Sequence, residues 1–178
     1  MPVRIALFRG INVGGRNSLP MKALSTLLES LGCADVKTYI QSGNVVFRHA
    51  STDVEKLSRD ISAAIDNEFG FLPNVLVLTP TDLQHAIDGN PFADATSEPK
   101  ILHLWFLAGE ARNVDLASIE SLKSESESFV LADRVFYLHA PDGIGRSKLA
   151  AGVERRLGVA TTARNWRTVS KILEMTQA

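Results

Sequence analysis

Apolar residues change their spacing from segment to segment along the first half of the chain. A run or alternation of apolar residues indicates a strand, and apolar residues three and four positions apart indicate a helix. Read this way, the sequence predicts a strand at residues 3–8, a helix at 20–31, strands at 36–41 and 44–48, a helix at 53–69 and a strand at 73–79. The first half therefore has the order β-α-β-β-α-β, followed by a helix that ends near residue 88.

The second half repeats this order. The same rules predict a strand at 101–108, a helix at 115–123, a hairpin of strands at 129–132 and 135–139, a helix at 147–157, a strand at 159–164 and a final helix at 165–176. We therefore predict an α+β fold, a tandem duplication of two ferredoxin-like (βαββαβ) subdomains, each followed by an extra helix. The subdomains are residues 1–90 and 101–178, joined by a linker at 91–100 and packed as one compact unit; one mixed sheet is the alternative.

Glycine is concentrated between the first strand and the first helix. Three glycines, two arginines and two asparagines fall within nine residues: Arg9, Gly10, Asn12, Gly14, Gly15, Arg16 and Asn17. Backbone N–H groups and guanidinium groups ahead of a helix suit an anion. The spacing nearly matches a P-loop, but Arg16 and Asn17 stand where that motif needs Lys and Ser or Thr. A tight strand-to-helix connection that binds nothing is the alternative.

The ferredoxin-like strand order, 4-1-3-2 with antiparallel neighbours, brings a second polar turn to this loop. The end of the first strand then lies beside the start of the third, where Ser42, Gly43 and Asn44 form a turn. Converging polar groups raise the expectation of a site. None of these residues is a general acid or base at neutral pH, so the predicted role is ligand binding.

A second candidate site is expected at one edge of the second sheet. It comprises His103, His139, Arg146, Ser147, Lys148, Arg164, Asn165 and Trp166. Cations, a helix N-terminus and an aromatic side chain suit a nucleotide or single-stranded nucleic acid. The two histidines would be cross-strand neighbours, which is either a structural pair or a catalytic feature. Alternatively, Ser147 only caps its helix and Trp166 belongs to the core.

Composition narrows the classes of function. The net charge of −1 gives no general attraction to nucleic acid or membranes, although residues 134–178 carry an excess of Lys and Arg. The single Cys33 excludes an intramolecular disulfide and suits a reducing cytoplasm, where we expect it to be a small buried apolar residue. We find no signal peptide, no membrane span and no set of residues that predicts a metal or cofactor.

Several motifs together resemble a known family. They are residues 9–15 (RGINVGG), 19–21 (LPM), 39–47 (YIQSGNVVF), 90–92 (NPF), 143–149 (GIGRSKL) and 163–169 (ARNWRTV). The chain resembles, over essentially its whole length, the bacterial family catalogued as domain of unknown function 1697. The resemblance implies a soluble bacterial protein with two associated ferredoxin-like subdomains, and it brings no established activity, substrate or cofactor.

Three hypotheses for function follow. The first is binding of an anionic ligand, either a phosphate-containing small molecule or nucleic acid, through the Gly/Arg loops. The second is an assembly protein, because the strand at 101–108 is apolar on both faces and must be covered by the other half or by a second chain in a homodimer. The third is an enzyme that uses His103, His139 or Ser147.

Overall fold

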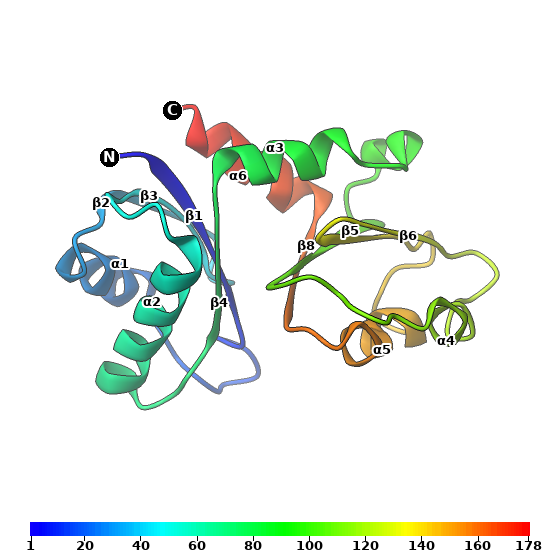
Figure 1. Ribbon diagram of the computed structural model, residues 1–178, viewed down its shortest axis with the longest axis horizontal. Helices are drawn as coiled ribbons and strands as arrows, with labels where there is room; N and C mark the ends of the chain where they lie inside the picture. The colour runs from blue at the N-terminus through cyan, green and yellow to red at the C-terminus, as the bar shows by residue number, and fades with distance from the viewer. The chain divides into compact units, whose positions relative to one another are not determined.

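The computed structural model describes all 178 residues. It is a mixed α+β protein with two four-stranded antiparallel sheets and six α-helices (Figure 1). The elements of the first half are β1 (Val3–Arg9), α1 (Met21–Ser30), β2 (Ala34–Tyr39), β3 (Asn44–Arg48), α2 (Val54–Phe69), β4 (Asn74–Leu78) and α3 (Pro80–Asp88). The later elements are a 3₁₀ helix η1 (Ala93–Ser97), β5 (Leu102–Leu107), α4 (Leu116–Glu120), β6 (Ser128–Ala132), β7 (Val135–His139), α5 (Lys148–Leu157), β8 (Thr161–Asn165) and α6 (Trp166–Thr176).

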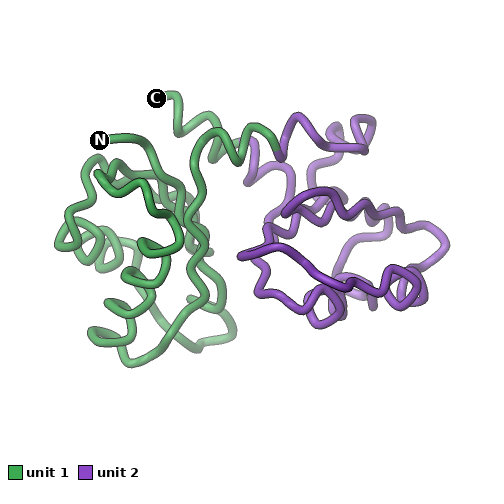
Figure 2. The backbone as a smooth tube through the Cα atoms, viewed as in Figure 1, with its two compact units in different colours: residues 1–85, 171–178 green, residues 86–170 purple.

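The chain divides into two compact units (Figure 2). One contains residues 1–85 together with 171–178, and the other contains residues 86–170. This division differs from the expected subdomains in two respects. Residues 86–90 and the expected linker at 91–100 group with the second unit, and the last residues of α6 group with the first unit. A single boundary in the sequence cannot assign residues 171–178 to the first unit, because they are separated from it in the sequence by the whole second unit.

The first sheet has the order β2-β3-β1-β4, and every neighbouring pair is antiparallel. Helices α1 and α2 cover one of its faces (Figure 1). Leu24 and Leu28 of α1 and Ile61 and Ile65 of α2 are fully buried, at the apolar positions that their helical spacing predicts. They pack against the strand residues on that face of the sheet, among them Ala6, Phe8, Val45, Phe47 and Val77.

The second sheet repeats the topology with the order β6-β7-β5-β8. Residues of α4 and α5 form a core with one face of this sheet, and Ile119, Leu149 and Val153 are fully buried there. All six residues of β5 are buried. Both faces of this strand are thus covered within a single chain, and a second chain is not needed for that purpose.

Most predicted elements agree with the structure to within about two residues, and β2 shows the main local difference. It begins and ends two residues earlier than expected. The strand ends at Tyr39 because Ile40 takes a positive φ of 51° and opens the turn into β3. Tyr39 is then the last residue of β2 and pairs with Asn44. The expected linker also contains the short helix η1.

Candidate functional site

The two polar turns of the first half lie against each other, as the strand order predicts. The backbone N–H of Phe8 donates to the carbonyl of Gly43 at 2.8 Å. Gly43 has a φ of 81°, and a Cβ atom added to it would lie 2.6 Å from Phe8 Cβ and 2.7 Å from Ile11 Cδ1. A side chain is therefore excluded at residue 43 both by backbone conformation and by space. We call residues 9–20 and 40–44 together the loop edge.

Gly14 and Gly15 form the tip of a small hairpin within this loop. The backbone N–H of Arg16 donates to the carbonyl of Val13 at 3.0 Å, and the two residues form a β-bridge. The φ angles of Gly14 and Gly15 are 59° and 71°, and positive values at both central residues are those of a type I′ turn. No atom lies within 4 Å of a Cβ added at either glycine. The turn conformation therefore accounts for both glycines, and it presents Val13 and Arg16 to solvent.

Asn12 holds the loop edge together. Its side-chain Nδ2 donates to the carbonyls of Leu19 at 2.9 Å and Gln41 at 3.0 Å, and its Oδ1 accepts from the Leu19 N–H at 2.7 Å. Asn17 has a similar role, because its Nδ2 donates to the Gly10 carbonyl at 2.8 Å. The side-chain amides of both residues thus form hydrogen bonds with backbone groups of the loop edge. This is a role that their residue types alone did not reveal.

Asn44 is also a structural residue in this structure. It is fully buried, and its Nδ2 donates to the Tyr39 carbonyl and to the Ser42 hydroxyl, both at 3.1 Å. These bonds close the β2–β3 turn. Arg9 and Arg16 are the charged residues among the predicted ligand-binding residues, and both are exposed.

The loop edge contains basic residues and no acidic residue. Arg9 and Arg16 are both exposed, and residues 9–20 and 40–44 contain no Asp or Glu. Helix α1 begins next to it at Met21, with no side-chain cap on its N-terminus and no acidic residue in its first turn. The partial positive charge of that helix end adds to the charge of the two arginines. This combination is suited to holding an anionic group.

The second predicted cluster is divided by its sheet. His139 lies opposite Leu102, whereas His103 lies opposite Leu138 and Asn165. Because successive residues of a strand point to opposite faces, His103 and His139 are on different faces. The expected cross-strand histidine pair was wrong, and the reason is a one-residue difference in register. Arg164, which pairs with Leu104, is on the face of His139.

The polar residues of this cluster have structural partners. Ser147 Oγ accepts from the Ala150 N–H at 3.0 Å and caps α5, as the sequence suggested. Asn165 Oδ1 accepts from the Thr168 N–H at 2.9 Å at the start of α6. Trp166 is partly buried, and Arg146 and Lys148 are exposed. Two capped helix ends are less available to an anion than the uncapped end of α1.

Burial lowers the pKa of two residues in this cluster. It lowers the pKa of His103 to about 4, so its imidazole is neutral at pH 7. The ring lies beside Trp105, with a centroid distance of 6.1 Å, and its Nδ1 is buried without a hydrogen-bond partner. Burial also lowers the pKa of Arg164 to about 10, which leaves the guanidinium protonated. His139 lies beside the ring of Phe92, with a centroid distance of 5.7 Å.

Cys33 is buried in the first core, as expected, and burial raises the pKa of its thiol to about 11. A thiol of that pKa is a poor nucleophile at neutral pH. No group of three or more His, Cys, Asp or Glu side chains is arranged to hold a metal ion. No helix has the length and apolar character needed to cross a bilayer.

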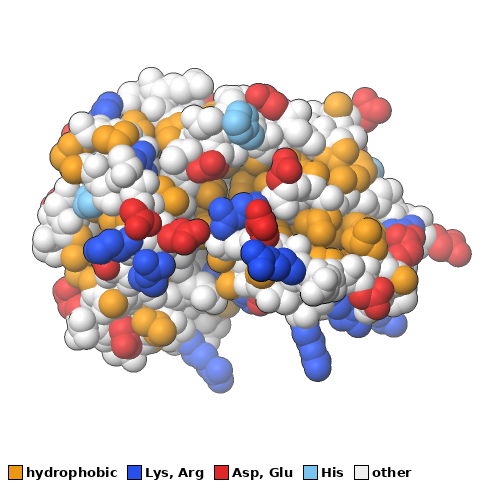
Figure 3. Space-filling model, viewed as in Figure 1, with side chains coloured by type: hydrophobic (Ala, Val, Ile, Leu, Met, Phe, Trp, Pro, Cys, Tyr) orange, Lys and Arg blue, Asp and Glu red, His pale blue; other side chains and the backbone are white.

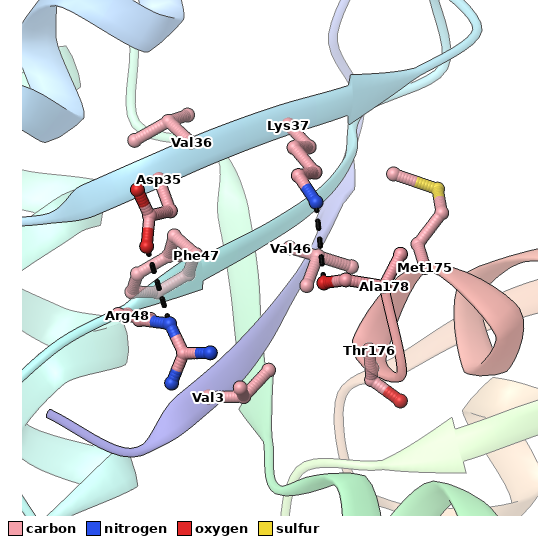
Figure 4. Close-up of a pocket in the computed structure, with 10 residues that line it drawn as sticks. All are labelled: Val3, Asp35, Val36, Lys37, Val46, Phe47, Arg48, Met175, Thr176 and Ala178. Atoms are coloured by element: carbon pink, nitrogen blue, oxygen red, sulfur yellow. Dashed lines mark hydrogen bonds and ion pairs between the residues drawn. The ribbon is translucent and has the colours of Figure 1, made fainter.

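A pocket that the sequence did not predict lies on the other face of the first sheet, within the first unit (Figure 4). Its volume is about 260 Å³, and its lining comes from β1, β2, β3 and the last residues of the chain. Lys37 and Arg48 approach it from the strands, and Met175 approaches it from α6 (Figure 4). No local signal marks this pocket, because residues 175–178 are distant in sequence from the strands they meet. On the face drawn in Figure 3, acidic and basic side chains are interspersed.

Comparison with known proteins agrees with this description. Among solved structures, the conserved bacterial protein SP0830 from Streptococcus pneumoniae is similar to this chain, with 23% identity and a TM-score of 0.75. The match covers 98% of each chain, which shows that the two share a fold. No curated protein matches the chain. The family described as "Protein of unknown function (DUF1697)" matches residues 1–137, and the chain therefore belongs to this family.

Proposed function

We propose that this protein binds a phosphorylated anion, a nucleotide or a nucleic-acid strand, at the loop edge. The observation that carries the proposal is the convergence of the Arg9–Asn17 loop, the Ser42–Asn44 turn and the uncapped start of α1. Residues 9–20 and 40–44 contain two exposed arginines and no carboxylate, and they lead directly into the uncapped start of α1. Charge-assisted hydrogen bonds from arginine are the usual means of binding phosphate.

The rigidity of the loop supports the same proposal. Asn12 and Asn17 fix the backbone through their side-chain amides, and Gly43 packs against Phe8 and Ile11 without space for a side chain. A prearranged site loses less conformational entropy on binding than a mobile one. The loop edge is thus organised before any ligand arrives.

Two exposed apolar residues favour a ligand with a base attached to its phosphate. Val13 is 65% exposed and Ile40 is 51% exposed, and both belong to the loop edge. Ile40 keeps this position although a β-branched residue with positive φ is unfavourable. Strained residues of this kind concentrate at functional sites. An apolar surface beside arginine suits the planar face of a nucleobase.

The repeated topology supports the finer description of the fold as a duplication of two ferredoxin-like subdomains, residues 1–90 and 101–178, with a linker at 91–100. Both sheets have the same strand order, and each is built from the same order of elements. We place the protein in a bacterial cytoplasm, where nucleotides and nucleic acids are abundant. Since β5 is covered within one chain, the proposal does not require a homodimer.

The test is thermal unfolding of the pure protein with nucleotides, coenzyme A, sugar phosphates, short RNA and short DNA. A ligand at 100 times its dissociation constant adds about 2.7 kcal/mol to the free energy of unfolding. We expect a stabilising shift in the wild type that is lost in Arg16→Ala and retained in Arg146→Ala. A shift lost only in Arg146→Ala would move the site to the second sheet. No shift with any ligand would favour the assembly hypothesis.

A further inference from the structure

Four strands lie at the edges of the two sheets: β2 and β4 in the first sheet, β6 and β8 in the second. An edge strand leaves backbone N–H and C=O groups open to pairing with another strand, and proteins usually hinder such pairing. Three of the four edges carry a hindrance. The register of β2 is irregular, the Val77 N–H of β4 donates to Ser58 Oγ at 3.0 Å, and the Thr161 N–H of β8 donates to Glu154 Oε2 at 2.8 Å.

The edge of β6 carries no such hindrance. Residues 128–132 include no proline and no charged residue, and they pair with β7 in one continuous register without a bulge. Their backbone forms no hydrogen bond to a loop or to a side chain. The side chains of Ser128, Val130 and Ala132 are exposed. The outer edge of β6 is therefore open to a further strand.

Two exposed carboxylates flank this edge. Glu125 precedes β6 and Asp133 follows it, and neither forms an ion pair. No Lys or Arg lies between them in the sequence. The nearest cations along the chain are engaged elsewhere, because Lys123 Nζ lies 3.4 Å from a carboxylate oxygen of Glu120 and Arg134 donates to a backbone carbonyl at 2.6 Å. A strand with a positive charge at each end would complement both carboxylates.

We propose that the outer edge of β6 binds an extended, basic segment of a partner protein by strand addition. The main chain of the segment continues the ladder, an apolar side chain at its centre packs beside Val130, and Lys or Arg at its ends meets Glu125 and Asp133. The edge lies in the second unit, and the proposal does not depend on the function proposed at the loop edge.

The charges favour such a partner over a second copy of this chain. Antiparallel pairing of two β6 strands about Val130 would place Glu127 of each copy opposite Asp133 of the other. Like charges directly opposite each other destabilise a pair of strands. A basic segment brings attraction to the same positions.

The experiment is a titration of the full chain with three peptides, KTVTVTK, ETVTVTE and KTVPVTK, followed through the backbone amide resonances of residues 128–132. We expect saturable shifts with KTVTVTK and weaker binding of ETVTVTE. We expect no saturable shift with KTVPVTK, because proline lacks an N–H and interrupts a strand. The proline peptide has the same charge as the first, so it separates strand pairing from simple attraction.

A double variant tests the two carboxylates. Glu125→Gln with Asp133→Asn should weaken the binding of KTVTVTK by roughly threefold or more at low salt, the combined effect of two exposed ion pairs. The turn should be retained, because asparagine tolerates the positive φ of 52° at residue 133. Asp66→Asn with Glu68→Gln removes the same charge from exposed positions of α2 and should leave binding unchanged.

Several results would overturn the proposal. If KTVTVTK causes no saturable shift in β6, the edge does not bind this kind of segment. Equal binding of KTVPVTK would show attraction without strand pairing, and equal affinity for ETVTVTE or in the two double variants would remove the role of the carboxylates. A dimer in sedimentation that Val130→Lys dissociates would show that a second copy of the chain occupies the edge.

Discussion

Replacing Gly43 by alanine tests whether the two loops meet as tightly as the structure shows. Gly43 has a φ of 81°, and an added Cβ would approach Phe8 Cβ to 2.6 Å and Ile11 Cδ1 to 2.7 Å. Neither neighbour has space to move away, because Phe8 and Ile11 are each 1% exposed within the first core. The substitution should therefore combine backbone strain with overpacking.

Gly15→Ala separates these two contributions. Gly15 has a similar φ of 71°, but no atom lies within 4 Å of its added Cβ. Alanine at residue 15 should cost about 1–2 kcal/mol, the cost of a left-handed conformation for a residue with a Cβ. Alanine at residue 43 should cost that amount plus about 1–3 kcal/mol of overpacking, giving about 2–5 kcal/mol in all.

The assay is urea unfolding of the wild type and both variants at pH 7, monitored by circular dichroism and fluorescence together. We expect the midpoint to fall further for Gly43→Ala than for Gly15→Ala. Equal destabilisation by the two substitutions would refute the close approach of the two loops. It would also remove the convergence on which the proposed site is based.

Three further predictions concern stability. Burial lowers the pKa of the His103 imidazole from 6.5 to about 4, so the unfolded chain binds a proton before the folded protein does as the pH falls. The contribution of the neutral ring to the free energy of unfolding is therefore complete above pH 6.5 and is lost as the pH falls towards 4. Relative to His103→Leu, the wild type should lose about 2 kcal/mol of unfolding free energy between pH 7 and pH 5 in urea unfolding, and an equal pH dependence in the two proteins would contradict the burial of a neutral imidazole. Ile40→Asn should raise the free energy of unfolding by about 1 kcal/mol, because asparagine tolerates positive φ; an unchanged or lower midpoint would argue against the strained conformation. Asn12→Ala should lower the free energy of unfolding by about 2 kcal/mol, because three hydrogen bonds are lost and the Leu19 N–H is left unpaired. Asn17→Ala removes one hydrogen bond and should lower it by less than about 1 kcal/mol. Equal destabilisation of the two variants in thermal unfolding would contradict the anchoring role of Asn12.

The order of the elements was predictable because it depends on local spacing of apolar residues. The leucines of α1 and the isoleucines of α2 are buried where helical periodicity puts them. The adjacency of the Gly43 turn to the first loop followed from the strand order, which in turn followed from the order of elements. These inferences require only the spacing of apolar residues over short segments and the strand order of the ferredoxin-like topology.

The faults in the sequence analysis arose where the result depends on register or on distant contacts. A shift of one residue between β5 and β7 decides whether His103 and His139 share a face, and residue spacing does not reveal it. Asn12 was expected to serve a ligand, but its amide faces the Leu19 and Gln41 carbonyls, whose positions are known only in the folded chain. The Lys37 pocket likewise needs the end of α6, which returns to the first sheet from more than a hundred residues away.

The most direct test of the proposed function follows the backbone amides of glycine during a titration with ATP and with a short single-stranded oligonucleotide. Glycine amides resonate in a distinct region of the nitrogen–proton spectrum, and the chain has glycines at both candidate sites. We expect saturable shifts at Gly10, Gly14 and Gly15, and we expect Arg16→Ala to abolish them. Saturable shifts confined to Gly143 and Gly145, or no shift with either ligand, would contradict the proposed function.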